Sequence, residues 1–260
     1  MLPHLLTCLG SLLPFRLLTR GNAKLGSISI WSIPAVATCP GSSALCRASC
    51  YATKGFYQQS NVIESLFKRL AICASPFFVL WMILSIRLQH SKVVRIHSAG
   101  DFYSSGYIAA WLTIVKACPG VQFFAYTRSW RVPVLRELLV QLSLQPNVQL
   151  WYSCDAETGI PVLTKEERFI RNAYMAVNLQ DIPTRAVDLV FRDYPTRAIV
   201  QKHVYGDLVC PAENGTGAHI TCDKCQLCFS AEKAAKMKNF FPGVNRRRPC
   251  GFRRVSLTLV

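Results

Sequence analysis

Acidic residues are scarce in this chain of 260 residues: 14 Asp and Glu stand against 30 Lys and Arg, which gives a formal net charge of +16. A charge excess of this size favours phosphate-rich partners, so nucleic acid is the first partner class that we expect. The chain is not a disordered one, because 51% of the residues are apolar and 11% are aromatic. The composition therefore predicts a folded, basic protein with ample material for a core.

Features of export and of membrane insertion are also missing or weak. The apolar residues of positions 1–18 lack a preceding basic segment and a small-residue cleavage site. Residues 70–86 are uncharged over a length at the low end for a membrane span, but they include Pro76 and are flanked by basic residues. We predict a buried helix here, with a membrane helix as the alternative, in a cytoplasmic protein that has no membrane partner.

No internal repeat is visible beyond an alternation of strands and helices. Short apolar runs rich in β-branched residues predict strands at residues 27–33, 93–97, 121–127, 148–153, 174–178 and 187–191. Helical periodicity covers residues 61–89, 107–116 and 134–144. Thr164 is expected to open a further helix, with Glu166 and Glu167 in its first turn. Strands that alternate with helices predict an α/β fold, a partial (β/α)6 barrel of mostly parallel strands with a C-terminal cysteine-rich extension.

Composition divides the chain into three parts. We expect an irregular extension over residues 1–20 and the α/β partial barrel with a cysteine loop over residues 21–200. Residues 201–260 form a cysteine-rich, metal-binding and basic region. In parallel α/β folds the loops at the carboxyl ends of the strands build the active site, so polar residues that follow the predicted strands are site candidates.

Seven of the twelve cysteines fall into two groups, and the first is Cys39, Cys46 and Cys50, hereafter the loop cysteines. Thiolates suit iron–sulfur clusters and zinc. Three ligands on one loop would hold a four-iron cluster and leave one iron open for a cofactor or substrate. A structural zinc site normally takes a fourth protein ligand, which Cys73 or Cys154 could supply. Three unliganded buried thiols are the remaining alternative.

The second group, hereafter the C-terminal cysteines, consists of Cys210, Cys222, Cys225 and Cys228. Its Cys-x2-Cys-x2-Cys run is typical of bacterial ferredoxins, in which a further Cys-Pro supplies another ligand. Four protein ligands make a closed site, which suits an auxiliary electron-transfer or structural [4Fe–4S] cluster. Zinc bound by four thiolates is the rival, and free thiols are the third possibility. Because the cysteines are bunched at ligand spacing, a disulfide scaffold is disfavoured.

The loop cysteines and the strand ends around them resemble the radical S-adenosylmethionine (SAM) superfamily. There a three-cysteine loop, commonly Cys-x3-Cys-x2-Cys, follows the first strand of a partial barrel, and a Gly-Gly-Glu-like motif after the second strand lies against the SAM amino group. Gly100 and Asp101 stand at that point here, and Ser153 and Asp155 end the fourth predicted strand. The resemblance implies that these residues bind SAM. His97 is a further cofactor-binding candidate; structural hydrogen bonding and helix capping are the alternatives.

A closer resemblance covers most of the chain. It is carried by the segments Leu17–Gly26, Cys39–Gly41, Cys50–Ala52, Arg95–Phe102, Ala125–Trp130 and Ser153–Asp155. Together these look like the phage protein family known as gene product 88. That family is largely uncharacterised, so the resemblance implies kinship and a phage, prophage or plasmid origin, and it leaves the activity open.

Two sets of residues are candidates for contact with nucleic acid. Arg128 and Trp130 follow the third predicted strand, where they could bind phosphate and stack on a base. Arg246, Arg247 and Arg248 form a basic run suited to phosphate contacts. Packing of Trp130 on the rim of the fold and solvation of the basic run are the alternatives.

These observations lead to two hypotheses from different classes. The first is a radical SAM-like enzyme that acts on a nucleic acid or nucleotide, carries one or two [4Fe–4S] clusters and takes electrons from an external donor. The second is a non-catalytic phage protein, stabilised by zinc or iron–sulfur, that binds nucleic acid or senses redox state. Metal identity and an open ligand position distinguish them.

Overall fold

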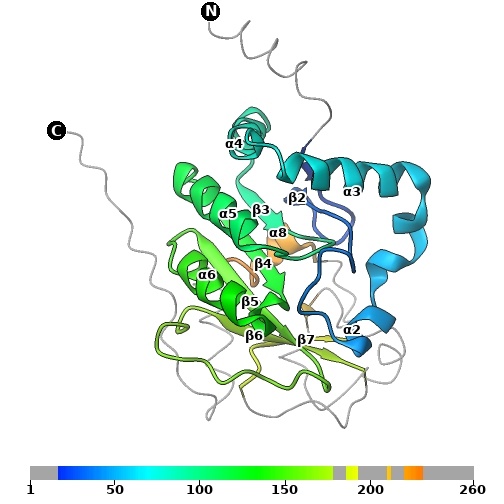
Figure 1. Cartoon of the computed structure of the whole chain (residues 1–260), viewed down its shortest axis with the longest axis vertical. Coiled ribbons are helices and arrows are strands. Elements are labelled where there is room, and N and C mark those ends of the chain that lie inside the picture. The colour runs from blue at the N-terminus through cyan, green and yellow to red at the C-terminus, as the bar shows by residue number, and fades with distance from the viewer. Residues whose placement is uncertain (1–16, 178–185, 193–209, 212–219, 231–260) are drawn as a thin grey trace, which may run out of the picture.

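The structure is a computed structural model, and it describes residues 17–177, 186–192, 210–211 and 220–230 (Figure 1). Several predictions fall outside these residues. They are residues 1–16 of the expected N-terminal extension, the end of the fifth predicted strand at Asn178, and the basic run of Arg246, Arg247 and Arg248.

A seven-stranded sheet forms the centre of the fold, and its strands lie side by side in chain order. They are β1 (Thr19–Arg20), β2 (Ser29–Trp31), β3 (Val93–Ile96), β4 (Gln122–Thr127), β5 (Val148–Cys154), β6 (Arg171–Ala176) and β7 (Leu189–Arg192). β1 pairs antiparallel with β2, and each later pair is parallel. No pairing among the described strands joins β1 to β7, so the fold is a mixed α/β fold with an open, mostly parallel sheet.

The six predicted strands are all present, although the fifth is displaced along the chain. β6 begins at Arg171, three residues before its predicted start at Tyr174. β1 was not expected, because two residues are too few to show the alternation that marks a strand. Leu17 and Leu18 before it are fully buried, so the last four residues of the expected irregular extension belong to the fold.

Long helices cover one face of the sheet. The described α-helices are α2 (Ala44–Ala48), α3 (Ser60–Cys73), α4 (Phe78–Leu88), α5 (Ser105–Ala117), α6 (Pro133–Ser143) and α8 (Cys222–Cys225). There are also three short 3-10 helices among the described residues: η1 (Tyr51–Thr53), η2 (Gly55–Gln58) and η3 (Ser129–Arg131). Figure 1 shows α4, α5 and α6 side by side, and the large core lies between them and the sheet. We call this side of the sheet the helix face.

The expected long helix over residues 61–89 is divided into α3 and α4. The break lies at Pro76, whose ring cannot donate a backbone hydrogen bond and clashes with the preceding turn. Phe78, Met82 and Ile86 recur at four-residue intervals in α4 and are buried against the sheet. No helix among the described residues is long and apolar enough to cross a membrane.

The prediction of a helix that begins at Thr164 is wrong, because the described residues 164–170 form turns. The reason lies in Glu167, whose buried carboxylate accepts hydrogen bonds from Arg136 Nε at 2.7 Å, Tyr152 Oη at 2.8 Å and the Thr164 N–H at 3.0 Å. A glutamate in this position suggested a favourable helix N-terminus. Here it serves instead as a buried acceptor that shapes the turn before β6.

The opposite side of the sheet, hereafter the inner face, is rich in aromatic side chains. They are Phe124, Tyr126, Trp151 and Phe191. Residues 222–230, which include α8, cover part of this face, and the Phe229 and Phe124 rings lie 5.5 Å apart. The sheet therefore separates a helix-covered core from a second face that receives the C-terminal cysteines.

Candidate site at two groups of cysteines

Two glycines allow the loop that carries Cys39, Cys46 and Cys50 to lie against the carboxyl ends of the strands. A Cβ on Gly41 would come within 1.9 Å of the Arg128 carbonyl oxygen after β4. Gly100, after β3, has a φ of +83°, and a Cβ there would lie 2.8 Å from Thr38 Oγ1. Both contacts require a residue without a Cβ. Gly100, which the sequence predicted to bind the cofactor, is a point of close packing between the strand end and the cysteine loop.

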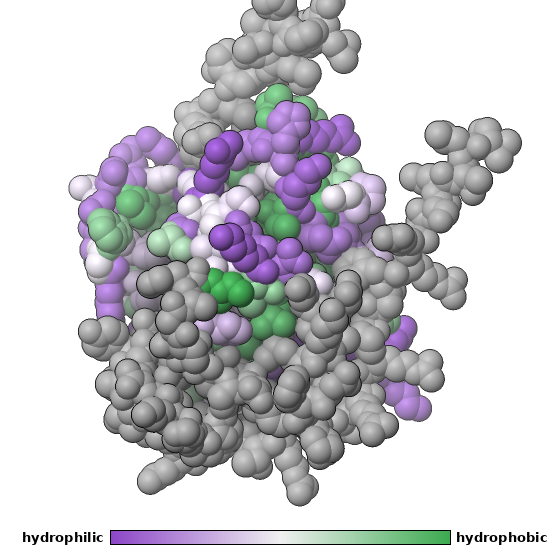
Figure 2. Space-filling model, turned by 180° about the vertical axis from the view of Figure 1, so that it is seen from behind, coloured by the Kyte–Doolittle hydropathy of each residue, from purple (hydrophilic) through white to green (hydrophobic). Residues whose placement is uncertain are grey.

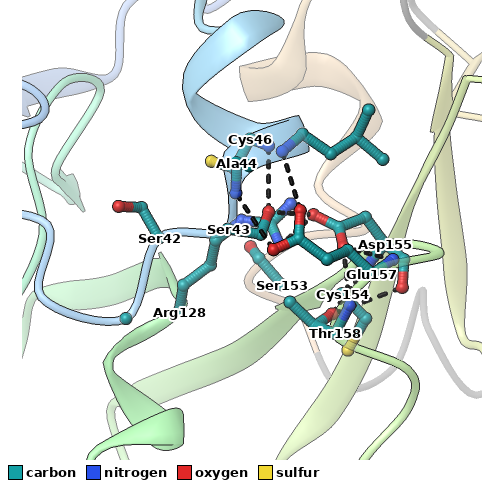
Figure 3. A network of polar contacts seen from close by, with 12 residues as sticks. Ser42, Ser43, Ala44, Cys46, Arg128, Ser153, Cys154, Asp155, Glu157 and Thr158 are labelled. Carbon is teal, nitrogen blue, oxygen red and sulfur yellow. Dashed lines mark hydrogen bonds and ion pairs between the residues drawn. The ribbon is translucent and has the colours of Figure 1, made fainter.

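The helix that carries Cys46 is held by the loop after β5 (Figure 3). Ser43 Oγ donates to Asp155 Oδ2 at 2.6 Å and accepts the Cys46 N–H at 2.9 Å, which makes Ser43 the N-cap of α2. The Glu157 carboxylate accepts the N–H groups of residues 44 and 45 at 3.1 and 2.9 Å. Donors left open at the start of α2 are thereby satisfied by one neighbouring loop.

Asp155 is fully buried and anchors this network. Arg128 Nη1 lies 2.6 Å from Asp155 Oδ2, and the N–H groups of Glu157 and Thr158 donate to Oδ1. Burial opposes ionisation of Asp155, but the hydrogen bond from Ser43 and the charge of Arg128 outweigh it and hold the pKa of this carboxyl below its ordinary value. Its oxygens therefore serve the protein itself, and Asp155 positions the cysteine loop.

The two described candidates for nucleic-acid contact also lie inside the protein. Arg128 is 7% exposed and pairs with Asp155. Trp130 is 8% exposed, donates its Nε1 hydrogen to the Ser153 carbonyl at 3.0 Å, and stacks on Tyr152 with ring centroids 5.7 Å apart. In the structure both side chains serve packing at the strand ends, and neither offers a surface to a partner.

Asp101 joins the ends of β3 and β4. Its carboxylate accepts Thr127 Oγ1 at 2.6 Å and the backbone N–H groups of Arg128 and Phe102 at 2.7 Å each. Burial raises the pKa of Asp101 to about 6, against the opposing effect of these hydrogen bonds. Asp101 thus follows β3, and its oxygens bind protein donors.

His97 lies on the helix face, where its ring packs against Phe102 and Tyr107. Its Nε2 is 2.9 Å from Tyr107 Oη, which also accepts the Trp31 Nε1 hydrogen at 2.8 Å. Burial, followed by the charge of Arg95, lowers the pKa of His97 to about 3, so the ring is neutral. These contacts fit the structural alternative for His97.

The three loop cysteines are half-buried and influence one another through charge. Burial raises the pKa of Cys39 to about 12, and the negative forms of Asp101, Cys46 and Cys50 add to the effect. Cys73, one alternative for a fourth zinc ligand, instead lies beside Tyr103 and Tyr107 in the helix-face core. The other alternative, Cys154, directs its thiol to the Tyr152 carbonyl.

The C-terminal cysteines gather on the inner face. Burial raises the pKa of Cys228 to about 12, and the negative forms of Cys210, Cys222 and Cys225 contribute, so all four interact. Tyr126 Oη donates to Cys228 Sγ at 2.9 Å. The Trp151 Nε1 hydrogen is donated to the Cys228 carbonyl, also at 2.9 Å. None of the ten described cysteines is in a disulfide.

Asp223 holds residues 222–230 against the residues just before β2. Its Oδ2 accepts the Ser27 N–H and the Ser27 hydroxyl, each at 2.8 Å. Gly26 lies so close that a Cβ there would meet Asp223 Oδ1 at 2.3 Å. The Cys222 N–H donates to the Lys24 carbonyl at 2.8 Å.

Arg95, in β3, is a site residue that the sequence reasoning missed. Its guanidinium lies 5.7 Å from the Tyr126 ring, and its buried Nε has no hydrogen-bond partner in the described part of the chain. Burial lowers the pKa of Arg95, but nearby groups with a negative form outweigh that effect and raise it. These groups are Tyr51, Tyr126, Cys228 and Cys222. An arginine between apolar residues of a short strand was the signal available in the sequence.

No group of three or more His, Cys, Asp and Glu side chains within the described ranges is arranged to hold a metal ion. A single ion needs its ligands about 2 Å from one point. A four-iron cluster differs, because each thiolate binds a separate iron. The unpaired Nε of Arg95 fits a centre of that kind, since thiolates bound to a cluster would supply the missing negative charge at Cys222 and Cys228.

Comparisons with known proteins bear on the family. The model for the family "Gene product 88" matches residues 16–237, a span that includes both cysteine groups. The chain is 26% identical to the "Gene 88 protein" of Mycobacterium phage D29 over 235 residues, which cover 82% of this chain and 88% of the relative. It is 27% identical to the "Gene 88 protein" of Mycobacterium phage L5 over 198 residues, 65% of this chain and 80% of the relative. No solved structure matches. The chain belongs to the gene product 88 family.

Proposed function

We propose that this protein is an iron–sulfur protein with two [4Fe–4S] centres. The loop cysteines would hold a cluster with one open iron, and the C-terminal cysteines would hold a closed, auxiliary cluster. The observation that carries the proposal is the position of Arg95, with its guanidinium 5.7 Å from the ring of Tyr126, which donates to Cys228 Sγ. No carboxylate of the described residues lies within ion-pair distance of this guanidinium. Arg95 is half-buried, and its buried Nε has no hydrogen-bond partner in the described part of the chain. Metal-bound thiolates would provide this cation with a negative partner.

We further propose that the open sheet is a partial (β/α)6 barrel and that the protein is a radical SAM-like enzyme. The consecutive parallel order of β2 to β7 and the cysteine loop at their carboxyl ends support this. When bound, an open cluster would supply one electron from an external donor for reductive cleavage of SAM, and the product radical would abstract hydrogen from the substrate. The net charge of +16 favours a nucleic acid or nucleotide substrate.

The protein's own residues have definite tasks in this proposal. Ser43, Asp155 and Glu157 orient the helix that carries Cys46. Gly41 and Gly100 let the loop lie close to the strand ends. Contact of Ser153 and Gly100 with the cofactor remains part of the proposal. Asp101, Asp155 and His97 act by holding the strand ends, as their hydrogen bonds indicate.

The test is anaerobic purification with measurement of iron, sulfide and zinc per chain, together with the visible and EPR spectra. We expect about eight irons per chain and an EPR signal of the reduced protein that changes when SAM is added. Cys46→Ala and Cys228→Ala should each lower the iron content by about half. The matched control is Cys118→Ala, which removes a buried cysteine of the helix-face core that belongs to neither group. Stoichiometric zinc in a colourless protein would overturn the proposal.

The second candidate is a non-catalytic protein, stabilised by zinc or by iron–sulfur, that binds nucleic acid or senses redox state. The positive net charge favours it, since charge alone supports binding to phosphates. About four irons per chain with no response to SAM would select the redox sensor over the enzyme. Zinc together with salt-sensitive binding of nucleic acid would select the binding protein.

A further inference from the structure

The inner face of the sheet places a cation and a hydrogen-bond donor beside the C-terminal cysteines. Arg95 and Tyr126 come from the neighbouring strands β3 and β4, and the guanidinium lies 5.7 Å from the tyrosine ring. Trp151, in β5, continues the stack, with its ring centroid 5.6 Å from that of Tyr126. A strand framework thus holds both polar groups toward the segment that carries Cys228.

Two of the neighbours that interact with Arg95 through charge are tyrosines, and two are cysteines. The tyrosines are Tyr51, which follows Cys50 in the cysteine loop, and Tyr126. A phenol is neutral at physiological pH, with an ordinary pKa near 10. Cys222 and Cys228 differ, because metal binding removes the thiol proton and leaves a negative sulfur. The charge of Arg95 therefore acts on the C-terminal cysteines when they bind metal.

Tyr126 acts on one sulfur directly. Its hydroxyl donates to Cys228 Sγ at 2.9 Å, and the same cysteine is fixed by the bond from Trp151 Nε1 to its carbonyl. A donor to a ligating sulfur withdraws electron density from the metal. Hydrogen bonds to the sulfurs and the net charge around a cluster are two of the factors that set its reduction potential.

We propose that Arg95 and Tyr126 are positioning residues that raise the reduction potential of a closed [4Fe–4S] centre at the C-terminal cysteines. The inference rests on the proposed function and adds the residues that tune one of its two centres. Reduction adds one electron, taken from an external donor, to a centre that is already negative. A nearby positive charge and a donated hydrogen bond stabilise the reduced form more than the oxidised form, so the centre accepts the electron more readily.

The experiment is an anaerobic redox titration of the full chain, followed by EPR. It is carried out in the Cys46→Ala background, which leaves the closed centre as the one that titrates. We expect Arg95→Gln and Tyr126→Phe each to shift the midpoint to a more negative potential, with unchanged iron content. Arg95→Lys should keep most of the wild-type value, because it keeps the charge. Arg87→Gln is the matched control, since Arg87 is an exposed arginine whose Nη2 donates to the Ala117 carbonyl, among the helices.

The outcomes distinguish a failure of this inference from a failure of the proposed function. Iron bound at the C-terminal cysteines with equal midpoints in Arg95→Gln, Tyr126→Phe and Arg87→Gln would overturn the inference and leave the proposed function standing. A wild-type protein that takes up no iron, or takes up zinc instead, would overturn both. If Arg95→Gln loses the cluster altogether, Tyr126→Phe and Arg95→Lys decide, because both keep the positive charge on the inner face.

Discussion

Single buried side chains at the ends of the strands hold the candidate site together. Asp155 and Arg128 illustrate this, since both are buried and each is the other's charge partner. Their pair also connects the end of β4 with the cap of the helix that carries Cys46. Loss of one partner leaves a buried charge uncompensated, which costs far more than the pair itself contributes.

We predict that Asp155→Ala lowers the free energy of unfolding by about 3–5 kcal/mol, the usual cost of removing one partner of a buried ion pair. Urea unfolding followed by circular dichroism measures the loss. Glu166→Ala, which removes an exposed carboxylate, is the control and should change stability little. A loss in Asp155→Ala no larger than in the control would mean that Arg128 finds water or another partner when Asp155 is removed.

His97 offers a test of burial through pH. Its pKa is lowered to about 3 in the folded protein, so the histidine stabilises the fold above its ordinary pKa near 6.5, and the contribution is lost as the pH falls toward 3. His97→Asn does not titrate, and asparagine tolerates the positive φ of 64° at this position.

We expect the stability difference between wild type and His97→Asn to shift against the wild type by about 2 kcal/mol between pH 7 and pH 5. Urea unfolding of both proteins at the two pH values gives this difference, and groups common to both, such as Asp101, cancel in it. A difference that stays constant with pH would show that His97 is protonated as easily in the folded chain as in the unfolded one.

At the scale of elements, one short helix carries two of the C-terminal cysteines and is fastened by one aspartate. Asp223 in α8 binds the N–H and hydroxyl of Ser27, just before β2. We predict that Asp223→Ala increases the rate at which iodoacetamide alkylates Cys222 and Cys228 in the metal-free protein, by severalfold. Mass spectrometry of the alkylated peptides measures the rates.

The control for this element is Glu64→Ala, which removes an exposed carboxylate that pairs with Lys68 in α3. Its alkylation rates should equal those of the wild type. Equal rates in Asp223→Ala as well would mean that Tyr126 and Trp151 hold the segment without the contact to Ser27.

How far the sequence predicts these elements depends on the range of the interactions that shape them. The six main strands follow from local runs of β-branched and apolar residues, and Pro76 explains the break between α3 and α4 once the structure is known. Glu167 led to the wrong prediction of a helix after Thr164, because its partners Arg136 and Tyr152 are distant in sequence. A local pattern carries no information about such partners.

The candidate site shows the same limit. Spacing alone identified both cysteine groups, and the structure brings the members of each group near one another. Arg128 and Trp130 were candidates for contact with a partner, with packing as the alternative for Trp130, and the structure pairs them inside the protein with Asp155 and the Ser153 carbonyl. Arg95 was named only within a segment of family resemblance, and not as a site residue, because its neighbours Tyr126 and Cys228 come from other parts of the chain.

For the whole molecule, the positive net charge predicts how partners bind. The face seen in Figure 2 has hydrophilic side chains gathered over its upper described part. We expect the affinity for a single-stranded oligonucleotide to fall as salt rises, with a slope of about −0.7 per phosphate contacted on a plot of log K against log salt. Fluorescence anisotropy at several salt concentrations gives the slope. An uncharged peptide nucleic acid of the same base sequence is the control, and equal binding of both would exclude a role for phosphate.

The contact between Ser27 and Asp223 has a consequence for how the molecule is made. The two residues are 196 positions apart, and the segment that includes Asp223 covers Phe124 and Tyr126 on the inner face. During synthesis, the ribosome releases the strands well before it releases residues 222–230, so Phe124 and Tyr126 lack this cover until those residues arrive. Closure over so long a separation is slow. A nascent chain therefore depends on residues 222–230, and on any metal that they bind, to cover this part of the aromatic surface, from which aggregation could begin.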